Sequence, residues 1–276
     1  MEAGKASRSA MGSGLLRAAH VREDRPPWIF EDTLAVQLLD ASEEAELEAS
    51  IATWAPEIRA AVRISHAVRA RLAEDVAITG LAAGRDQYVL LGAGLDTFSW
   101  RHPRASAFVI SEVDHPDTQA WKRAALERAG LVEPPNVRFI AVDLLTSAID
   151  DLEFPDRATW NWMGVTMYLE RSVTEAMLHS IASRRAGTTL VVNFLLVPEA
   201  LDALGQAVRT ASTVAVTASE ERVVSTYSSE QVLTLLGGAG FNDIELFDAH
   251  ALGDRYLTGR VDVRLPNSTV IAVATV

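Results

Sequence analysis

The amino-terminal third of the chain has the hydrophobic spacing of helices. We expect three helices between Glu31 and about Ala83, separated near Asp40 and Pro56. In the last of them, apolar residues recur mostly three and four positions apart, which places an apolar stripe along one side of a helix. The stripe consists of Ile58, Ala61, Val62, Val68, Leu72, Val76 and Leu81. Residues 1 to 24 keep no such period, so we expect a flexible tail there.

After Gly84 the pattern changes to short apolar runs that alternate with helical segments. This alternation is typical of an α/β fold with a mostly parallel sheet and helices on both faces. Two later helices are expected to begin with capping boxes, at Ser172 with Glu175 and at Ser228 with Gln231. The expected strands are Tyr88 to Leu91, Phe108 to Val113, Val137 to Val142, a fourth that ends at Trp160 to Gly164, Thr188 to Leu196, Phe241 to Phe247, and one within Leu265 to Val276.

One segment interrupts the alternation. Pro198 to about Arg222 is rich in alanine and has helical spacing, and we expect it to cover the ligand end of the sheet as a lid. The predicted organisation is therefore a tail over residues 1–24, a helical cap over 25–84, and a sheet domain over 85–276 whose lid spans about 198–225.

A glycine turn follows the first strand directly. Gly92-Ala93-Gly94 comes after Leu91. This pattern is typical of a buried strand that ends in a turn where the backbone comes close to a ligand. A dinucleotide fold would need a third glycine three positions after Gly94, and this chain has Thr97 there. The turn therefore favours a cofactor with a nucleoside and no pyrophosphate, such as S-adenosylmethionine, over a nicotinamide dinucleotide. It could also be only a tight strand-to-helix turn.

An acidic residue follows the second strand. Asp114 lies 22 positions beyond Gly92, near the offset expected of a carboxylate that binds ribose hydroxyls. Asp114 could instead cap the helix that begins near Asp117. His115, the next residue, could lie against an adenine ring or in an exposed turn. Asp143 follows the third strand and could likewise be only a turn residue.

Composition narrows the classes of partner. The chain has 276 residues, 49% of them apolar, a formal net charge of −12 and a pI near 5.0, which argues against binding nucleic acid through its phosphates. It has no cysteine, and its histidines lack a metal-binding spacing, so we expect neither disulfides nor a metal site. No signal peptide or membrane-spanning stretch is apparent, so we expect a cytoplasmic protein without a membrane partner.

At this point the sequence resembles the leucine carboxyl methyltransferase family, including bacterial members that O-methylate secondary metabolites. The matching motifs occur in order across roughly residues 25 to 276. They are Arg69, Leu91-Gly-Ala-Gly-Leu-Asp-Thr97, Trp100-Arg101, Glu112-Val-Asp-His-Pro116, Lys122, Val142-Asp-Leu144, Gly164, Met167-Tyr168-Leu169 and Gly240-Phe241. The resemblance implies a Rossmann-like class I methyltransferase sheet of seven strands, the last antiparallel, that binds S-adenosyl-L-methionine. Amino-terminal helices and an insertion after the fifth strand would cover its active site.

The resemblance also implies roles for matched residues. Arg69 would hold the carboxylate of the cofactor, Asp114 its ribose and Asp143 the edge of its adenine. The cofactor-binding residues implied in this way, together with their direct neighbours, are Arg69, Gly92, Ala93, Gly94, Asp114, His115, Asp143, Leu144 and Met163. One position departs from the family, which usually has Glu-Gly where this chain has Met163-Gly164.

The acceptor is expected to be a small molecule, methylated at a carboxylate or hydroxyl oxygen. A carboxylate would need no base, whereas a hydroxyl would be helped by one, and Tyr168 and His250 are the candidates. The missing glutamate and the tryptophans, Trp28 and Trp162 above all, favour the alternative of C- or N-methylation of an aromatic acceptor. A module that binds S-adenosylmethionine without methyl transfer is the alternative of another class. The oligomeric state is left open, a homodimer being one option.

Overall fold

The computed structural model describes residues 7–146, 149, 152–217 and 222–276. Its centre is a seven-stranded sheet with the order β3-β2-β1-β4-β5-β7-β6, in which only β7 runs antiparallel to its neighbours. The strands are β1 Gln87–Leu91, β2 Val109–Asp114, β3 Val137–Ala141, β4 Thr159–Trp162, β5 Thr189–Leu195, β6 Asp243–Phe247 and β7 Thr269–Thr275. This arrangement confirms the predicted α/β class and the expected antiparallel last strand.

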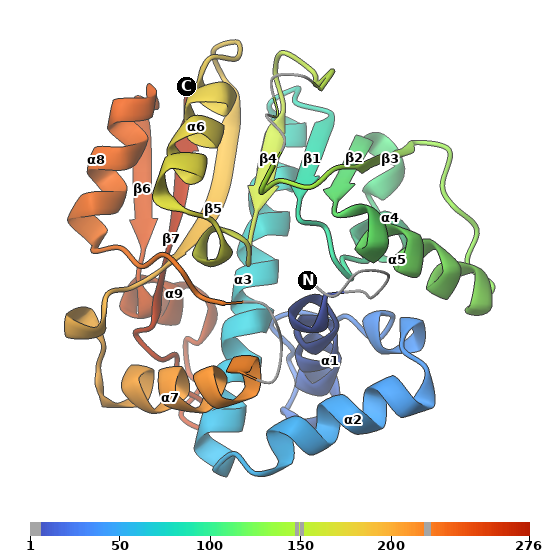
Figure 1. Ribbon diagram of the computed structural model, residues 1–276, viewed down its shortest axis with the longest axis vertical. Coiled ribbons are helices and arrows are strands. Elements are labelled where there is room, and N and C mark those ends of the chain that lie inside the picture. Colours follow the sequence, from blue (N-terminus) through green and yellow to red (C-terminus); the bar gives the residue numbers. More distant parts are fainter. Residues whose placement is uncertain (1–6, 147–148, 150–151, 218–221) are drawn as a thin grey trace.

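Helices cover both faces of the sheet (Figure 1). One face packs on α6 and α8, whose apolar side chains join the largest core cluster, and the other packs on α3, α4 and α9. The longer helices are α1 Arg8–Glu23, α2 Ala41–Ala52, α3 Pro56–Ala82, α5 Pro116–Arg128, α6 Arg171–Ala182, α7 Ala203–Thr217, α8 Ser229–Ala239 and α9 Ala249–Tyr256. The short ones are η1 Ala35–Leu38, α4 Phe98–Arg101, η2 Ala105–Ala107, η4 Thr166–Tyr168 and η5 Pro198–Ala200.

The sheet order reverses between β1 and β4, because the chain adds β2 and β3 on one side of β1 before it places β4 on the other. Ligands of open α/β sheets bind beyond the carboxyl ends of the strands at such a point. In Figure 1 the arrowheads of β4 and β6 point toward the end of the molecule where α1, α2 and α7 gather. The fold therefore places these helices over the expected ligand end.

The predicted tail is wrong for most of its length. Residues 8–23 form helix α1, and residues 1–6 lie outside the described part of the chain. Leu15 and Leu16 are buried in a cluster with α2 and α3, and Gly14 lies so close to Leu95 that a Cβ there would be 3.0 Å from its side chain. The helix has little amphipathic period because tertiary contacts, not a regular stripe, stabilise it.

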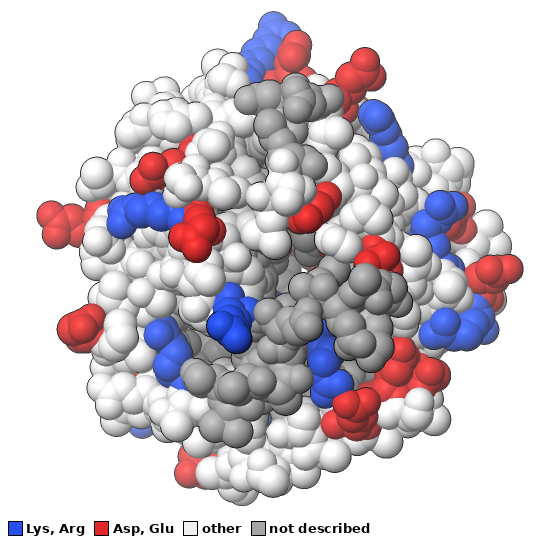
Figure 2. Space-filling model, viewed as in Figure 1, with Lys and Arg blue, Asp and Glu red and all other residues white. Residues whose placement is uncertain are grey.

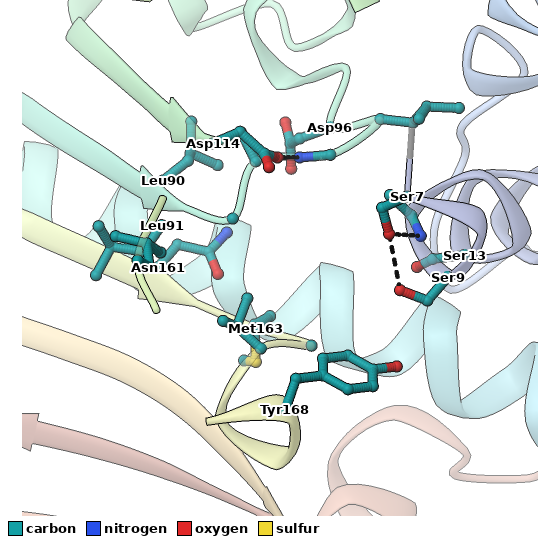
Figure 3. A pocket seen from close by; sticks show the side chains of 18 of the residues that line it. Ser7, Ser9, Ser13, Leu90, Leu91, Asp96, Asp114, Asn161, Met163 and Tyr168 are labelled. Atoms are coloured by element: carbon teal, nitrogen blue, oxygen red, sulfur yellow. Dashed lines mark hydrogen bonds between the residues drawn. The ribbon is translucent and has the colours of Figure 1, made fainter. Parts of the chain in front are cut away.

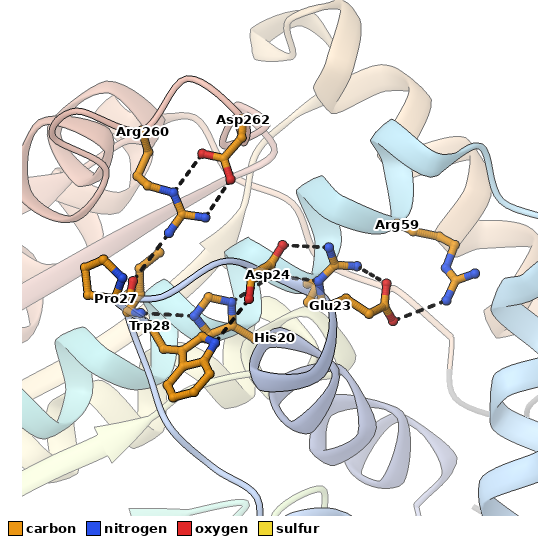
Figure 4. Close-up of polar contacts among 10 residues, drawn as sticks. His20, Glu23, Asp24, Pro27, Trp28, Arg59, Arg260 and Asp262 are labelled. Atoms are coloured by element: carbon orange, nitrogen blue, oxygen red, sulfur yellow. Dashed lines mark hydrogen bonds and ion pairs between the residues drawn. The ribbon is translucent and has the colours of Figure 1, made fainter.

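A buried polar cluster fixes the end of α1 (Figure 4). The Ile29 amide donates to Nε2 of His20 at 3.0 Å, so the ring proton is on Nδ1, which donates to Asp24 at 2.7 Å. Arg63 on α3 donates to both oxygens of Asp24, each at 2.7 Å, and to Glu23 at 2.8 Å. Burial alone would raise the pKa of Asp24, but Arg63 and His20 lower it to about 2.

We expect this cluster to make stability depend on pH at the acidic end. Because the pKa of Asp24 is lower in the folded chain than its ordinary 3.8, its contribution is complete above pH 3.8 and is lost as pH falls toward 2. The shift corresponds to about 2 kcal/mol. In urea unfolding, the free energy of unfolding of wild type should exceed that of Asp24→Asn by about 2 kcal/mol less at pH 2 than at pH 6. A difference that stays constant, as expected for the exposed control Asp243→Asn, would contradict the role of Asp24.

Of the two predicted capping boxes, one is confirmed. Ser228 accepts from the Gln231 amide at 3.2 Å while the Gln231 side chain accepts from the Ser228 amide at 2.9 Å. The box at Ser172 is wrong, since the N-cap of α6 is two residues earlier, at Glu170, and its side chain makes no capping bond. Ser172 lies inside the first turn, where its hydroxyl cannot act as the N-cap.

Candidate functional site

A cavity of about 630 Å³ lies at the carboxyl ends of β1, β2 and β4. Figure 3 shows it between the strand ends, with Asp114, Asn161 and Met163, and the serines of α1 on the opposite side. All nine residues predicted to bind a cofactor line it: Arg69, Gly92, Ala93, Gly94, Asp114, His115, Asp143, Leu144 and Met163. The structure thus brings together residues from five separate stretches of the chain.

The two glycines are required by the shape of the turn. Gly92 has φ +67° and Gly94 φ +48°, a backbone region that favours glycine. A Cβ on Gly92 would collide with Cγ2 of Val165, and one on Gly94 would lie 3.0 Å from Cβ of Ala10 in α1. The turn is tight, as the simpler interpretation held, and it also lines the cavity with backbone.

Asp114 is held by main-chain amides. Its Oδ2 accepts from Gly94 at 2.5 Å and its Oδ1 from His115 at 2.7 Å, so each oxygen keeps a further lone pair for a ligand. Burial raises the pKa of Asp114, although these two amides oppose the rise. It does not cap the following helix. The N-cap of α5 is His115, whose Nδ1 accepts from the Asp117 amide at 3.2 Å. Asp114 is therefore free to bind hydroxyl groups.

Arg69 is a cation without a counterion. Its Nη2 donates to Ser13 at 3.0 Å, and no Asp or Glu of the described chain forms an ion pair with it. Burial, and then the neighbouring charge of Arg17, lower the pKa of Arg69 to about 10. Its guanidinium lies beside Gly164, where a Cβ would be 3.5 Å away. A carboxylate from a ligand would neutralise this charge.

Asn161 contributes an unpaired hydrogen-bond acceptor to the cavity, where Arg69 contributes donors. Its Nδ2 donates to the Tyr88 hydroxyl at 3.0 Å, while its buried Oδ1 has no hydrogen-bond partner in the described part of the chain. A buried acceptor without a donor is costly, by about 1–3 kcal/mol. Asn161, Arg69 and Asp114 line one cavity, which can therefore hold a ligand with a donor such as an ammonium, a carboxylate and a pair of hydroxyl groups.

Glu74, a buried residue of α3, adds a further acid to the cavity. It pairs with Arg101, but burial raises the pKa of Glu74 to about 7, with Arg101 opposing the rise. Asp143 plays the turn role that was left open, since its Oδ1 accepts from the Leu145 amide at 2.9 Å, and it also lines the cavity beside Leu144.

A second cavity, of about 280 Å³, shares part of its wall with the first. Most of its lining is apolar and comes from α1, α2, α3, α7, α9 and the ends of β5 and β7. Within the described residues, its lining contains no Asp, Glu or Lys. Six residues line both cavities: Ser9, Ser13, His66, Arg69, Met167 and Tyr168. In Figure 3 Tyr168 extends from the segment after β4 toward the side lined by α1.

Three candidates from the sequence lie away from these cavities. His250 is on α9 with 86% of its side chain exposed, where it faces Asp254 at 3.7 Å, so its proposed part in the chemistry has no support from geometry. Trp28 is exposed, with its Nε1 donating to the Asp24 carbonyl at 3.2 Å, and Trp162 is wholly buried in the core. The tryptophan that lines a cavity is Trp54, in the second one.

Sequence reasoning missed Ser13, His66, Asn161 and Asn193. Ser13 was placed in the tail. His66 lies in a predicted helix and Asn161 in a predicted strand, at positions that belong to no motif. Only the folded structure shows that they line a cavity. The spacing to Arg69 is the signal that could have found His66. It lies three residues before Arg69 and four after Val62, and residues at these spacings share one face of a helix.

Charge around the site is mixed. On the face shown in Figure 2, acidic and basic side chains are interspersed, and Lys or Arg side chains border the hollow at its centre. Arg17, Arg69 and Arg222 line the first cavity. In the described residues no helix combines the length and hydrophobicity needed to cross a membrane, and no group of three or more His, Asp or Glu could hold a metal ion.

Comparison with known sequences gives the same family as the motifs. The family model of leucine carboxyl methyltransferase matches residues 10–182. YktD of Bacillus subtilis, which carries the name of an S-adenosyl-L-methionine-dependent methyltransferase, is 28% identical over 95% of this chain and 95% of its own. A protein of Mycolicibacterium gilvum with a name of the same kind is 34% identical over 49% of this chain and 51% of its own.

Comparison with solved structures shows the fold. A protein of Thermobifida fusca named as a methyltransferase has a TM-score of 0.59 at 15% identity, covering 99% of this chain and 96% of its own. An O-methyltransferase family protein of Burkholderia thailandensis has a TM-score of 0.54 at 13% identity, covering 95% and 68%. From its matched residues and its sheet, the chain belongs to the leucine carboxyl methyltransferase family, and it is an enzyme that uses S-adenosylmethionine.

Proposed function

We propose that this enzyme methylates an oxygen, a hydroxyl or a carboxylate, of a small and largely apolar acceptor such as a secondary metabolite. The observation that carries the proposal is the second cavity, which is mostly apolar and shares six residues with the cavity that suits the cofactor. An acceptor bound there would reach the reacting methyl group across this shared wall. Positioning of this kind can supply a large part of the rate enhancement.

The first cavity suits the cofactor by its chemistry. Asp114 would bind the ribose hydroxyls, Arg69 the carboxylate and Asn161 the ammonium group, so that each otherwise unmatched group of the cavity gains a partner. Gly92, Ala93 and Gly94 would lie along the methionine part with Met163. Asp143, Leu144 and His115 would contact the adenine. When bound, the cofactor supplies an activated methyl group on a sulfonium.

The chain itself would do the rest by binding and orientation. Helix α1 covers the glycine turn, with Arg17 donating to the Leu95 carbonyl at 2.6 Å and to Asp32 at 2.9 Å, so it would help to exclude water. Tyr168 lines both cavities and is kept as a candidate that orients the acceptor. The α7 segment, with Val208 in the second cavity, would close this end as a lid.

Calorimetry and product analysis test the proposal together. S-adenosylmethionine should bind the intact chain with a micromolar dissociation constant, and S-adenosylhomocysteine should be released with apolar hydroxylic or carboxylic acceptors. Binding without release for any acceptor would instead favour a cofactor-binding module. Release with the methyl group found on carbon or nitrogen of an aromatic acceptor would favour the rival reaction, to which Trp54 in the second cavity lends some support.

A further inference from the structure

His66 occupies the wall between the two cavities and lines both. It is on α3, and its Nδ1 lies 2.8 Å from the Val62 carbonyl oxygen, one turn earlier. A carbonyl oxygen only accepts, so Nδ1 must carry the ring proton and Nε2 must carry a lone pair. No other hydrogen bond to His66 occurs within the described chain. The free Nε2 is therefore an acceptor of fixed tautomer at the junction of the two cavities.

The charges around His66 keep it neutral. Burial, and then the charge of Arg69 on the same helix, lower the pKa of His66 to about 3, and Arg17 on α1 adds to the effect. Tyr168, from the segment after β4, lines both cavities as well, and Arg8, the other cation of the second cavity, is paired with Glu46. The described lining of the second cavity contains no carboxylate, so no anion there stabilises a protonated ring at neutral pH.

Asn193 lines the same cavity. Its Oδ1 accepts from the Gly164 amide at 2.6 Å, which settles the orientation of the side-chain amide. Its buried Nδ2 then has no partner among the described residues. With Arg69 taken up by the carboxylate of the cofactor, as proposed above, the second cavity offers the unpaired Nε2 of His66 within a mostly apolar wall. Such a cavity suits an uncharged molecule with a hydroxyl group better than an anion.

We propose that Nε2 of His66 accepts a hydrogen bond from the hydroxyl group that is methylated, and that the acceptor is a neutral, largely apolar alcohol or phenol rather than a carboxylic acid. This inference rests on the proposed function and names its substrate class. A carboxylate at neutral pH has no proton to offer Nε2, so its oxygens would meet the lone pair of the ring, and the apolar cavity would also have to desolvate its charge.

The proton then has a defined route. As the hydroxyl oxygen forms its new bond to the methyl carbon, the carbon–sulfur bond breaks with its electron pair remaining on sulfur. The oxygen, now with three bonds, becomes strongly acidic, and its proton passes to Nε2 of His66 and from there to water. A weak base is sufficient at this stage, because the proton is released to it as the methyl group transfers. His66 returns to its neutral form when the product leaves.

Two substitutions separate the acceptor atom from the fold of the helix. His66→Asn can keep the hydrogen bond to the Val62 carbonyl but has no atom at the place of Nε2, whereas His66→Gln can place an oxygen there. His250→Asn, on the exposed face of α9, is the matched histidine control. The probes are 4-butylphenol and 4-butylbenzoate, which share one apolar body and differ in the group that is methylated.

Wild type should release S-adenosylhomocysteine with 4-butylphenol at a kcat/KM at least about 100-fold above that with 4-butylbenzoate. His66→Asn should lose about 100-fold or more with the phenol, His66→Gln about 10-fold or less, and His250→Asn nothing. The dissociation constant for S-adenosylmethionine should stay within about twofold in all of them. Binding of 4-butylphenol, followed by tryptophan fluorescence, to which Trp54 in the second cavity contributes, should weaken in His66→Asn even where turnover is too slow to measure.

Each opposite result overturns the inference. Equal or better turnover of the benzoate, an unchanged kcat/KM in His66→Asn, or failure of 4-butylphenol to bind the cofactor-loaded wild type would remove His66 from this role. These outcomes leave cofactor binding intact. A wild-type chain that does not bind S-adenosylmethionine would instead overturn the proposed function, so the two failures are distinguishable by calorimetry alone.

Discussion

Asp114→Ala is expected to raise the dissociation constant for S-adenosylmethionine by at least about 100-fold. Hydrogen bonds to a charged group contribute about 1.5–3 kcal/mol each, and the carboxylate would bind two ribose hydroxyls. The substitution also releases the amides of Gly94 and His115, which now hold the glycine turn against β2. Isothermal titration of the folded variant measures the effect, with Asp243→Ala as a control for loss of a surface carboxylate.

Asp114→Asn should be almost as damaging, although it keeps the shape of the side chain. Both oxygens of Asp114 accept from main-chain amides, so the Nδ2 of an asparagine would have to face one of these two donors. An asparagine variant that binds the cofactor as tightly as wild type would show that the carboxylate does not contact the ribose. It would also remove the strongest support for the assignment of the first cavity.

Arg69→Met is expected to abolish most cofactor affinity while making the unliganded chain more stable. The loss follows from the missing partner for the cofactor's carboxylate, and we expect about a 100-fold or greater rise in the dissociation constant. The gain follows because the guanidinium is buried beside Arg17 without a counterion, and its pKa is lowered to about 10. Below pH 10 Arg69 is charged in both states, and keeping this charge in the folded chain rather than the unfolded one lowers the free energy of unfolding by about 3 kcal/mol.

Thermal unfolding of the apo chain checks the second half of this prediction, and calorimetry the first. Arg71→Met is the matched control, since Arg71 lies two residues away but is half exposed and paired with Asp75 at 2.8 Å. Arg71→Met should be slightly less stable than wild type and should bind the cofactor with an unchanged dissociation constant. A lower melting temperature for Arg69→Met would mean that the cation has a partner that stabilises it, and the site would then need a different occupant.

The sheet and the cofactor cavity could be predicted because their signals are local. The turn at Gly92 and Gly94 and the acid at Asp114 lie at the ends of buried apolar strands, whose order along the chain sets which residues meet at one edge. Helix α1 could not be predicted, because much of its stability comes from residues far away in the sequence. Gly14 and Arg17 contact Leu95, and Arg63 binds Asp24 at the end of the helix. The capping box at Ser172 failed because α6 begins two residues before the start that the motif predicts, with Glu170 as its N-cap.

The second cavity marks the limit of sequence reasoning. Its wall is assembled from five helices and two strand ends, so no spacing within one segment can indicate it. His66 and Asn193 become informative only when their hydrogen bonds are known, since these bonds fix which atom of each side chain is left for a ligand.

The wall shared by the two cavities also has a consequence for inhibitor chemistry. A single compound that joins an adenosyl amino acid to a short apolar arm could reach from the first cavity into the second past Met167 and Tyr168, which line both. It would lose translational freedom once instead of twice, so its two halves would reinforce each other as linked ligands do. The length of the arm that gives the tightest compound would then report how far apart the two chambers lie in solution.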